Sequence, residues 1–253
     1  MRVETEANVE LAQLDAVQWL RGLPSDSLDL LITDPPYESL EKHRAVGTTT
    51  RLKVSAASSN PWFTVFPNAR FPELFSQVYR VLKPNSHFYL MCDQETAFIA
   101  KPMAESAGFK FWKPLIWDKA TIGMGYHYRA RYEFVLFFEK GKRKLNDLGI
   151  ADVITVPRVR GGYPAEKPSA LSETLILQSS AAGDIVADPF MGSGSVGAAA
   201  LKLSRRFLGN DVSDSALAHA RARFALLGGQ EGAVLPPAAE SATGQRRLSL
   251  VLP

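Results

Sequence analysis

The stretch DIVADPFMGSGSVGAAALKLS, residues 184–204, decides the fold class. A short apolar run ends at Asp188, a turn with glycines follows, and an alanine-rich segment comes next, which is the order strand, tight turn, helix. A second strand is predicted over residues 206–210, directly before Asp211, and a helix over 213–227. Strands that alternate with helices predict an α/β fold with a doubly wound, mostly parallel sheet and helices on both faces.

The rest of the chain continues this alternation. Further strands are predicted at 8–14, 29–33, 87–91, 109–117 and 131–138, and further helices at 71–82, 95–107, 168–180 and just before residue 20. We interpret residues 1–227 as a single domain with insertions at about 38–69 and 119–165. Residues 228–253 are rich in Gly, Pro, Ala, Ser and Gln, and this composition predicts a disordered tail.

Composition excludes several classes of protein. The chain has 253 residues, 46% hydrophobic and 22% charged, which is typical of a globular protein. Apolar runs of roughly 20 residues, long enough to cross a bilayer, are absent from the sequence. The acidic start MRVETEANVE does not resemble a signal peptide, so we expect a cytoplasmic protein. One cysteine and four scattered histidines lead us to expect no metal site.

The motif Asp34-Pro35-Pro36-Tyr37 follows the apolar run DLLIT and marks the end of a strand. An exocyclic amine of adenine or cytosine is a poor nucleophile because its lone pair is delocalised into the ring. Two acceptors, the Asp34 carboxylate and the Pro35 carbonyl, could draw such an amine toward tetrahedral geometry and stabilise the charge that develops on nitrogen. Tyr37 is predicted to stack on a base flipped out of the duplex. The plainer interpretation is a rigid Pro-Pro turn with a tyrosine packed beneath it.

The string GSGSVG, residues 192–197, also fits the dinucleotide pattern G-x-G-x-x-G. Asp211 suits the ribose hydroxyls of either NAD or S-adenosylmethionine. A carboxylate at Asp188 would repel a pyrophosphate but would favour a methionine ammonium group, and NAD leaves Asp34 without a role. The sequence therefore favours S-adenosylmethionine as the cofactor, without a metal.

These motifs together resemble the β-class amino methyltransferases of DNA, in which the catalytic tetrapeptide precedes the cofactor loop. The resemblance spans about residues 10–227 and implies a Rossmann-like methyltransferase fold with circularly permuted motif order. It implies catalytic roles for Asp34, Pro35, Pro36 and Tyr37. The implied cofactor-binding residues are Asp15, Ala16, Asp34, Lys167, Asp188, Pro189, Phe190, Gly192, Ser193, Gly194 and Asp211. Lys167, or the helix start beside it, would meet the methionine carboxylate, and Asp15 would contact the cofactor adenine.

The resemblance implies a site-specific DNA methyltransferase, and Asp rather than Ser at position 34 favours N6 of adenine. N4-cytosine methylation and RNA amine methylation stay open as alternatives, as does a catalytically silent module that binds cofactor and DNA. Protein amide methylation is disfavoured because its tetrapeptide begins with Asn. Cytosine C5 methylation would need a cysteine nucleophile, but Cys92 ends an apolar strand and is better interpreted as a core thiol.

Double-stranded DNA is the expected partner. Residues 110–160 hold eleven Lys and Arg against five Asp and Glu, which suggests a surface that faces a polyanion, although charge alone fits an ordinary solvated basic face equally well. The candidate DNA contacts are Lys42, Arg44, Arg51, Tyr126, Arg129, Arg131, Lys142, Arg143, Arg158 and Arg160. A target-recognition region would lie at about 141–162. The sequence leaves open a homodimer, a cognate restriction enzyme and the target sequence.

Overall fold

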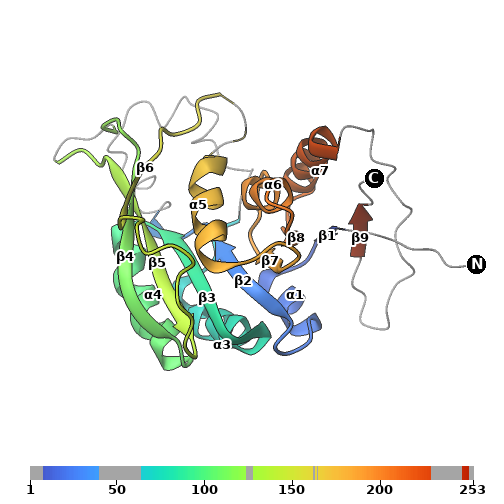
Figure 1. Ribbon diagram of the computed structural model, residues 1–253, viewed down its shortest axis with the longest axis horizontal. Helices are drawn as coiled ribbons and strands as arrows, with labels where there is room; N and C mark the ends of the chain where they lie inside the picture. Colours follow the sequence, from blue (N-terminus) through green and yellow to red (C-terminus); the bar gives the residue numbers. More distant parts are fainter. Residues whose placement is uncertain are drawn as a thin grey trace, which may run out of the picture.

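The computed structural model describes residues 8–39, 64–123, 128–161, 163, 165–228 and 247–250, and among these residues one sheet of nine strands forms the centre of the molecule (Figure 1). In spatial order the strands are β6 (Val153–Thr155), β4 (Lys110–Asp118), β5 (Tyr132–Lys140), β3 (Leu82–Cys92), β2 (Leu28–Thr33), β7 (Ile185–Asp188), β8 (Arg206–Asn210), β1 (Val9–Ala12) and β9 (Arg247–Leu250). Five of the strand pairs are parallel and three are antiparallel. The mostly parallel sheet predicted from the sequence is confirmed.

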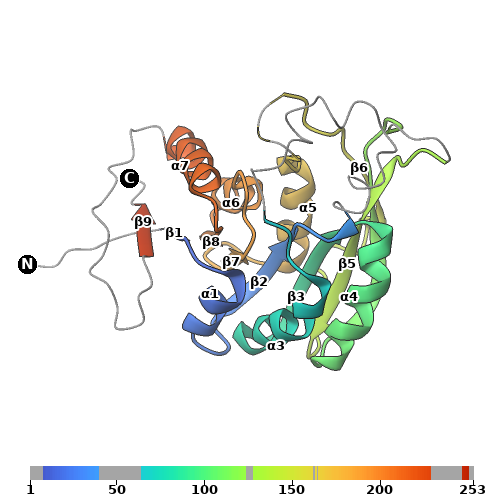
Figure 2. The same cartoon turned by 180° about the vertical axis from the view of Figure 1, so that it is seen from behind.

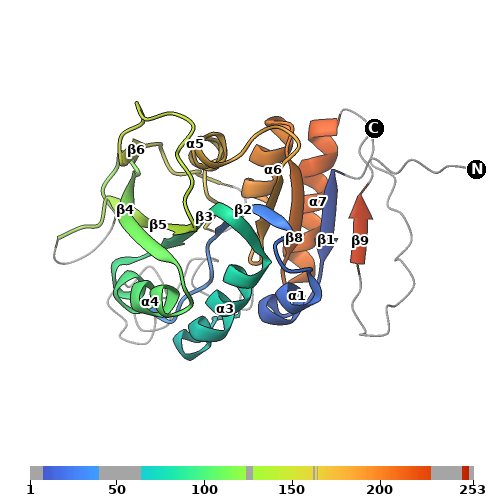
Figure 3. The ribbon, with the colours of Figure 1, turned by 60° about the horizontal axis from the view of Figure 1, so that its bottom comes forward.

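Helices cover both faces of this sheet, as Figures 2 and 3 show. One face carries α1 (Ala16–Gly22), α3 (Phe71–Val81) and α4 (Gln94–Ser106), and the other carries α5 (Ser169–Ser179), α6 (Ser195–Lys202) and α7 (Asp214–Gly228). A short 3₁₀ turn, η1 (Asn68–Arg70), leads into α3. Each helical layer has its own buried apolar cluster against the sheet. The result is a three-layer α/β/α domain.

Strand β2 shows why the apolar run before Asp34 forms a central strand. Leu28 and Leu31 pack into the cluster beneath α1 and α3, whereas Leu30 and Ile32 pack into the cluster beneath α5 and α6. A strand that is buried on both faces needs apolar residues at successive positions, and DLLIT supplies them.

The strand order reverses between β2 and β7. These two strands are parallel neighbours, and the strands next to them, β3 beside β2 and β8 beside β7, lie on opposite sides of the pair. In open α/β sheets, ligands bind beyond the carboxyl ends of the strands at such a switch point. The strands β2, β7, β8 and β1 all terminate at the same end of the sheet, which we call the carboxyl edge. We call the end where these strands begin the amino edge.

The observed elements differ from the sequence prediction in three places. The strand expected at 87–91 begins at Leu82, because the Lys83-Pro84-Asn85 segment forms a register shift within β3 instead of a loop. The three-residue strand β6, in the region expected to be loop, is too short to carry a period. Within the predicted tail, Arg247–Leu250 pairs antiparallel with β1 as β9, and the rest of that tail lies outside the described residues. No helix among the described residues is long and apolar enough to cross a membrane.

Candidate active site

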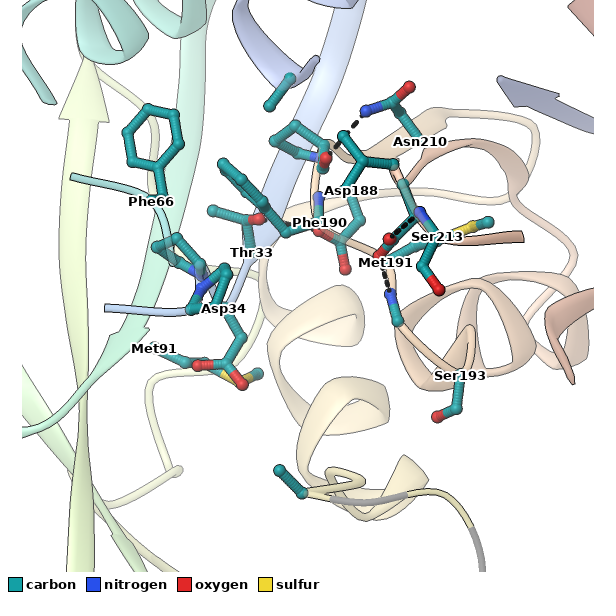
Figure 4. Close-up of a pocket in the computed structure, with 18 of the residues that line it drawn as sticks. Thr33, Asp34, Phe66, Met91, Asp188, Phe190, Met191, Ser193, Asn210 and Ser213 are labelled. Atoms are coloured by element: carbon teal, nitrogen blue, oxygen red, sulfur yellow. Dashed lines mark hydrogen bonds between the residues drawn. The ribbon is translucent and has the colours of Figure 1, made fainter. Parts of the chain in front are cut away.

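Four carboxylates meet at the carboxyl edge, each placed by a different strand. Asp34 follows β2, Asp188 ends β7, Asp211 follows β8, and Asp15 lies three residues beyond β1. All four line one cavity of about 540 Å³. Figure 4 shows Asp34 on one side of this cavity, Asn210 and Ser213 on the other, and Asp188 between them. The structure therefore brings together both motifs that the sequence analysis singled out.

Asp34 has two different carboxylate oxygens. Oδ2 accepts a hydrogen bond from Nζ of Lys167, while Oδ1 is buried without a hydrogen-bond partner. Lys167 lies just before α5, and its Nζ is also 3.4 Å from Oε2 of Glu133 at the start of β5. Glu133 is held in turn by Lys119, whose Nζ donates to Oε1 at 2.5 Å. Sequence reasoning missed Glu133 and Lys119, because neither belongs to a motif and the basic segment that contains them was interpreted as facing DNA.

Burial and neighbouring charges compete in setting the pKa values of Asp34, Lys167 and Glu133. Burial raises the pKa of Asp34, Lys167 opposes that rise, and Glu133 adds to it. Burial penalises the charged form of Lys167, but the neighbouring Asp34 and Glu133 carboxylates outweigh this, so the pKa of Lys167 is raised. Burial likewise opposes ionisation of Glu133, but Lys167 and Lys119 lower its pKa. Lys167 and Lys119 therefore offset part of the cost of ionising two carboxylates inside the protein.

The prolines and the tyrosine after Asp34 are fixed by packing. The carbonyl of Pro36 accepts a hydrogen bond from the backbone N–H of Phe66 at 2.7 Å, and the Phe66 ring lies edge-on to Phe190 with centroids 5.1 Å apart. Tyr37 lines the cavity but is only 7% exposed and belongs to the apolar core. Most of the tyrosine ring is thus covered, as the plainer interpretation of the motif expected.

Asp188 is a buried carboxyl. Its Oδ1 accepts hydrogen bonds from the Thr33 hydroxyl at 2.7 Å and from the backbone N–H of Phe190 at 3.0 Å. Burial raises the pKa of Asp188 to about 7, although both hydrogen bonds oppose the rise. A cation in the cavity would favour the ionised form of this group.

The loop between β7 and α6 is held by the end of β8. The backbone N–H of Gly192 donates to Oδ2 of Asp211 at 3.0 Å, and the backbone N–H of Met191 donates to the carbonyl of Asn210 at 3.0 Å. Gly194 caps α6 in the left-handed region, at φ +75°, where a Cβ atom would lie 2.8 Å from the Phe224 ring. Glycine is needed here for both reasons.

Asp15 has a partner that the sequence did not indicate. It caps α1 by accepting from the backbone N–H of Val17, and both of its oxygens accept from the guanidinium of Arg70 at 2.7 and 2.8 Å. Arg70 also lies 5.0 Å from the centroid of the Phe66 ring. The Arg70 ion pair lowers the pKa of Asp15. Arg70 comes from an unperiodic segment, so only the fold brings it to the cavity.

The predicted DNA-contacting residues are divided between the two edges. Strand β6 is parallel to β4, and Asp118 at the end of β4 pairs with Thr155 and Tyr132, so the chain around Arg129, Arg158 and Arg160 leaves the sheet at the carboxyl edge. These arginines are exposed. Arg131 is exposed as well, but two of its three donor nitrogens, Nε and Nη2, donate to Asp118 at 2.6 and 2.7 Å.

Lys142 and Arg143 correct the sequence prediction. Strand β5 is antiparallel to β3 and pairs Ser86 with Lys140, so the residues after Lys140 lie at the amino edge, away from the cavity. The error arose because basic residues that are close in sequence were treated as one surface. The other predicted contacts, Lys42, Arg44, Arg51 and Tyr126, lie outside the described residues.

Cys92 is fully buried in the core, which confirms that it is a core thiol. Burial raises the pKa of this thiol well above its ordinary value. Among the described residues, no group of three or more His, Cys, Asp and Glu side chains could hold a metal ion.

Comparison with known proteins matches residues 28–158 and 150–222 to the DNA methylase family of N6 and N4 methyltransferases. The type II methyltransferase M.HpaI of Haemophilus parainfluenzae is 28% identical over 240 residues, covering 83% of this chain and 72% of that protein. The M1.HpyAVI–SAM complex superposes with a TM-score of 0.63 and 22% identity, covering 85% of this chain and 98% of that one. The cytosine-N4-specific PvuII DNA methyltransferase superposes with a TM-score of 0.68 and 16% identity, covering 88% of this chain and 90% of that one.

Proposed function

This chain belongs to the DNA methylase family of N6-adenine and N4-cytosine methyltransferases, and we propose that it transfers a methyl group from S-adenosylmethionine to N6 of an adenine flipped out of DNA. The observation that carries the proposal is the carboxylate of Asp34, a residue that lines the cavity: one of its oxygens is held by Lys167, and the other is buried without a hydrogen-bond partner.

The cavity suits S-adenosylmethionine. Its volume of about 540 Å³ lies within the range of about 300–1,000 Å³ usual for small-molecule sites. Carboxylates line it, and these favour a cationic ligand and disfavour a pyrophosphate. We propose that Asp188 faces the methionine ammonium, Asp211 the ribose hydroxyls, and Asp15 and Ala16 the adenine. The glycine turn, through Gly192, Ser193 and Gly194, and the adjoining Pro189 and Phe190 would complete the binding surface.

The chain's own residues would prepare the amine. S-adenosylmethionine, when bound, supplies a methyl group on a positively charged sulfur. Oδ1 of Asp34 would accept one N–H of the target amine, and the Pro35 carbonyl would accept the other. The Pro36 carbonyl is already engaged by Phe66, which leaves that of Pro35 for the substrate. As the nitrogen bonds to the methyl carbon, the carbon–sulfur bond would break and its electron pair would stay on the sulfur. The Asp34 carboxylate would stabilise the positive charge that forms on the nitrogen, which then loses a proton to solvent.

The choice of adenine rests on Asp at position 34, which is typical of the N6-adenine group. Because the matched family includes both N6 and N4 enzymes, N4 of cytosine is the second candidate. The same two acceptors would serve either amine, so the base is decided by the shape of the substrate pocket and by its other contacts.

DNA would approach the carboxyl edge. The target atom is inaccessible in a duplex, so the base must leave the stack to reach Asp34. Arg129, Arg158 and Arg160 are exposed on the chain that leaves this edge, and we propose that they contact phosphates. Arg131 would have to leave Asp118 to do the same.

The decisive experiment incubates methyl-labelled S-adenosylmethionine with unmethylated genomic DNA and, in a parallel reaction, with RNA, followed by digestion to nucleosides. We expect the label on N6-methyladenosine. Label on N4-methylcytosine would keep the mechanism and reverse the base, whereas label only in RNA would move the substrate class. Binding of both cofactor and DNA with no transfer to either nucleic acid would identify a catalytically silent module.

A further inference from the structure

Four charged side chains form a row that ends at the catalytic carboxylate. From the protein outward to the reaction centre they are Lys119, Glu133, Lys167 and Asp34, with alternating positive and negative charge. Nζ of Lys119 is 2.5 Å from Glu133 Oε1, Nζ of Lys167 is 3.4 Å from Glu133 Oε2, and the same Nζ donates to Oδ2 of Asp34. At least three quarters of each side chain is buried.

The indole of Trp117 supports the two lysines. Their Nζ atoms lie 5.1 Å (Lys119) and 5.9 Å (Lys167) from the centroid of its ring, within the range of a cation–π contact. Trp117 itself is 3% exposed and donates from Nε1 to the Val156 carbonyl at 2.8 Å. This contact joins the row to β4 and the chain after β6, so the charges sit on rigid elements of the fold.

We propose that the row Lys119–Glu133–Lys167 is the positioning device of Asp34: it fixes Oδ2, keeps the carboxylate ionised and leaves Oδ1 free for the substrate amine. This deepens the methyl-transfer function proposed above and rests on it. Lys167 therefore acts on the catalytic carboxylate, in addition to any contact with a bound cofactor. Because Lys119 balances the charge of Glu133, the charge of Lys167 is available to stabilise the Asp34 carboxylate.

The alternating charges predict the direction in which each substitution shifts the pKa of Asp34. Removing the charge of Lys167 should raise this pKa, and removing that of Glu133 should lower it. Removing the charge of Lys119 should raise it again, by less. A purely structural role in holding the fold together would produce no alternation. Among the described residues, Asp188, Tyr37 and Cys92 also interact electrostatically with Asp34, and all variants below leave these three residues unchanged.

The direct test is ¹³C NMR of the unliganded protein labelled at the aspartate carboxyl carbon, with the Asp34 signal assigned by its loss in Asp34→Asn. Lys167→Met should raise the titration midpoint of Asp34 by roughly 1–3 pH units, the size expected for loss of an adjacent opposite charge. Glu133→Gln should lower the midpoint, and Lys119→Met should raise it by less than Lys167→Met. Lys167→Arg should keep the midpoint within about one unit of wild type, since it preserves the charge.

The matched control is Lys140→Met, which removes a second buried lysine from the amino edge, where Lys140 pairs with Asp26. It should lower the melting temperature without moving the Asp34 midpoint. An unchanged midpoint in Lys167→Met, or an equal change in Lys140→Met, would overturn the proposal.

Methyl transfer provides the second readout. In Lys167→Met the ratio of the rate at pH 9 to that at pH 6 should exceed the wild-type ratio by about tenfold or more, because only high pH then ionises Asp34. Rates lowered equally at all pH values would indicate a structural role and contradict the inference. If the wild type transfers no methyl group to DNA, the proposed function fails, while the NMR midpoints still decide whether the row controls Asp34.

Discussion

The two edges of the sheet each hold a buried lysine paired with an aspartate, and the two pairs are built differently. At the amino edge, Nζ of Lys140 donates to Asp26 Oδ1 at 2.7 Å and to the carbonyls of Tyr79 and Leu82 at 2.8 and 2.5 Å. Its three protons are thus all used, two of them by the backbone. More than half of the Asp26 side chain is exposed to solvent.

At the carboxyl edge, Lys167 lies between two carboxylates, and Asp34 keeps a buried oxygen without a partner. An unpartnered buried oxygen costs free energy of about 1–3 kcal/mol. The fold tolerates that cost at Asp34 and avoids it in the Lys140–Asp26 pair. The comparison indicates that the Lys140 pair serves stability, while the Lys167 pair serves a ligand that supplies the missing donor.

The largest expected difference between the edges is in catalysis. Asp34→Ala should lower the rate of methyl transfer by more than about 100-fold, because the amine loses the acceptor that stabilises its developing charge, and cofactor affinity should change little. Asp26→Ala should destabilise the protein and leave the rate per folded molecule unchanged. Single-turnover kinetics with equilibrium cofactor titration measure both. Full activity in Asp34→Ala would exclude Asp34 as the catalytic carboxylate.

A smaller effect is expected on cofactor binding. Asp211→Ala should weaken S-adenosylmethionine about 10- to 100-fold, as expected for lost hydrogen bonds to a charged acceptor, and because the Gly192 turn loses its anchor. Asp29→Ala is the matched change at the amino edge, where Asp29 accepts from the Ile185 N–H at 2.9 Å and from Lys83. Titration calorimetry should give the Asp29→Ala variant an affinity for S-adenosylmethionine near that of the wild type. Equal losses in both variants would remove the ribose assignment.

The smallest effect concerns DNA. The double variant Arg158→Ala/Arg160→Ala should bind DNA more weakly, and the slope of log affinity against log salt should fall by about one for each lost phosphate contact. Lys142→Ala/Arg143→Ala removes two equally basic residues from the amino edge and should leave the slope unchanged. Fluorescence anisotropy over a salt series distinguishes the pairs. A larger loss from the second pair would place DNA on the other side of the sheet.

Much of the fold could be predicted because the strongest signals are local. The apolar run before Asp34 and the strand–turn–helix at 184–204 each carry their own period and their own stop signal. The three-residue strand β6 and the edge strand β9 could not be predicted, because they are too short to show a pattern and exist only through pairing with β4 and β1. Likewise, the Lys83–Asn85 segment has the composition of a turn, but its place in the sheet is set by neighbouring strands.

The candidate site was predicted where a residue's role depends on its position beside a strand end. Asp34, Asp188 and Asp211 each follow or end an apolar strand, and parallel strands bring such ends to one edge. Arg70, Glu133 and Lys119 could not be found this way. Arg70 and Glu133 line the cavity and Lys119 contacts Glu133, each from a segment whose sequence carries no motif, so only the fold brings them there.

The sequence by itself determined the layered architecture, the edge where the motifs meet and the chemistry of the principal carboxylates, because short-range patterning and residue type suffice for these. Only the tertiary structure decided which charges face each other: Lys167 on Asp34, Arg70 on Asp15, and the basic residues after Lys140 on the edge away from the cavity. The reason is physical. The state of a buried charge depends on distance and on exclusion of solvent, and neither is encoded in spacing along the chain.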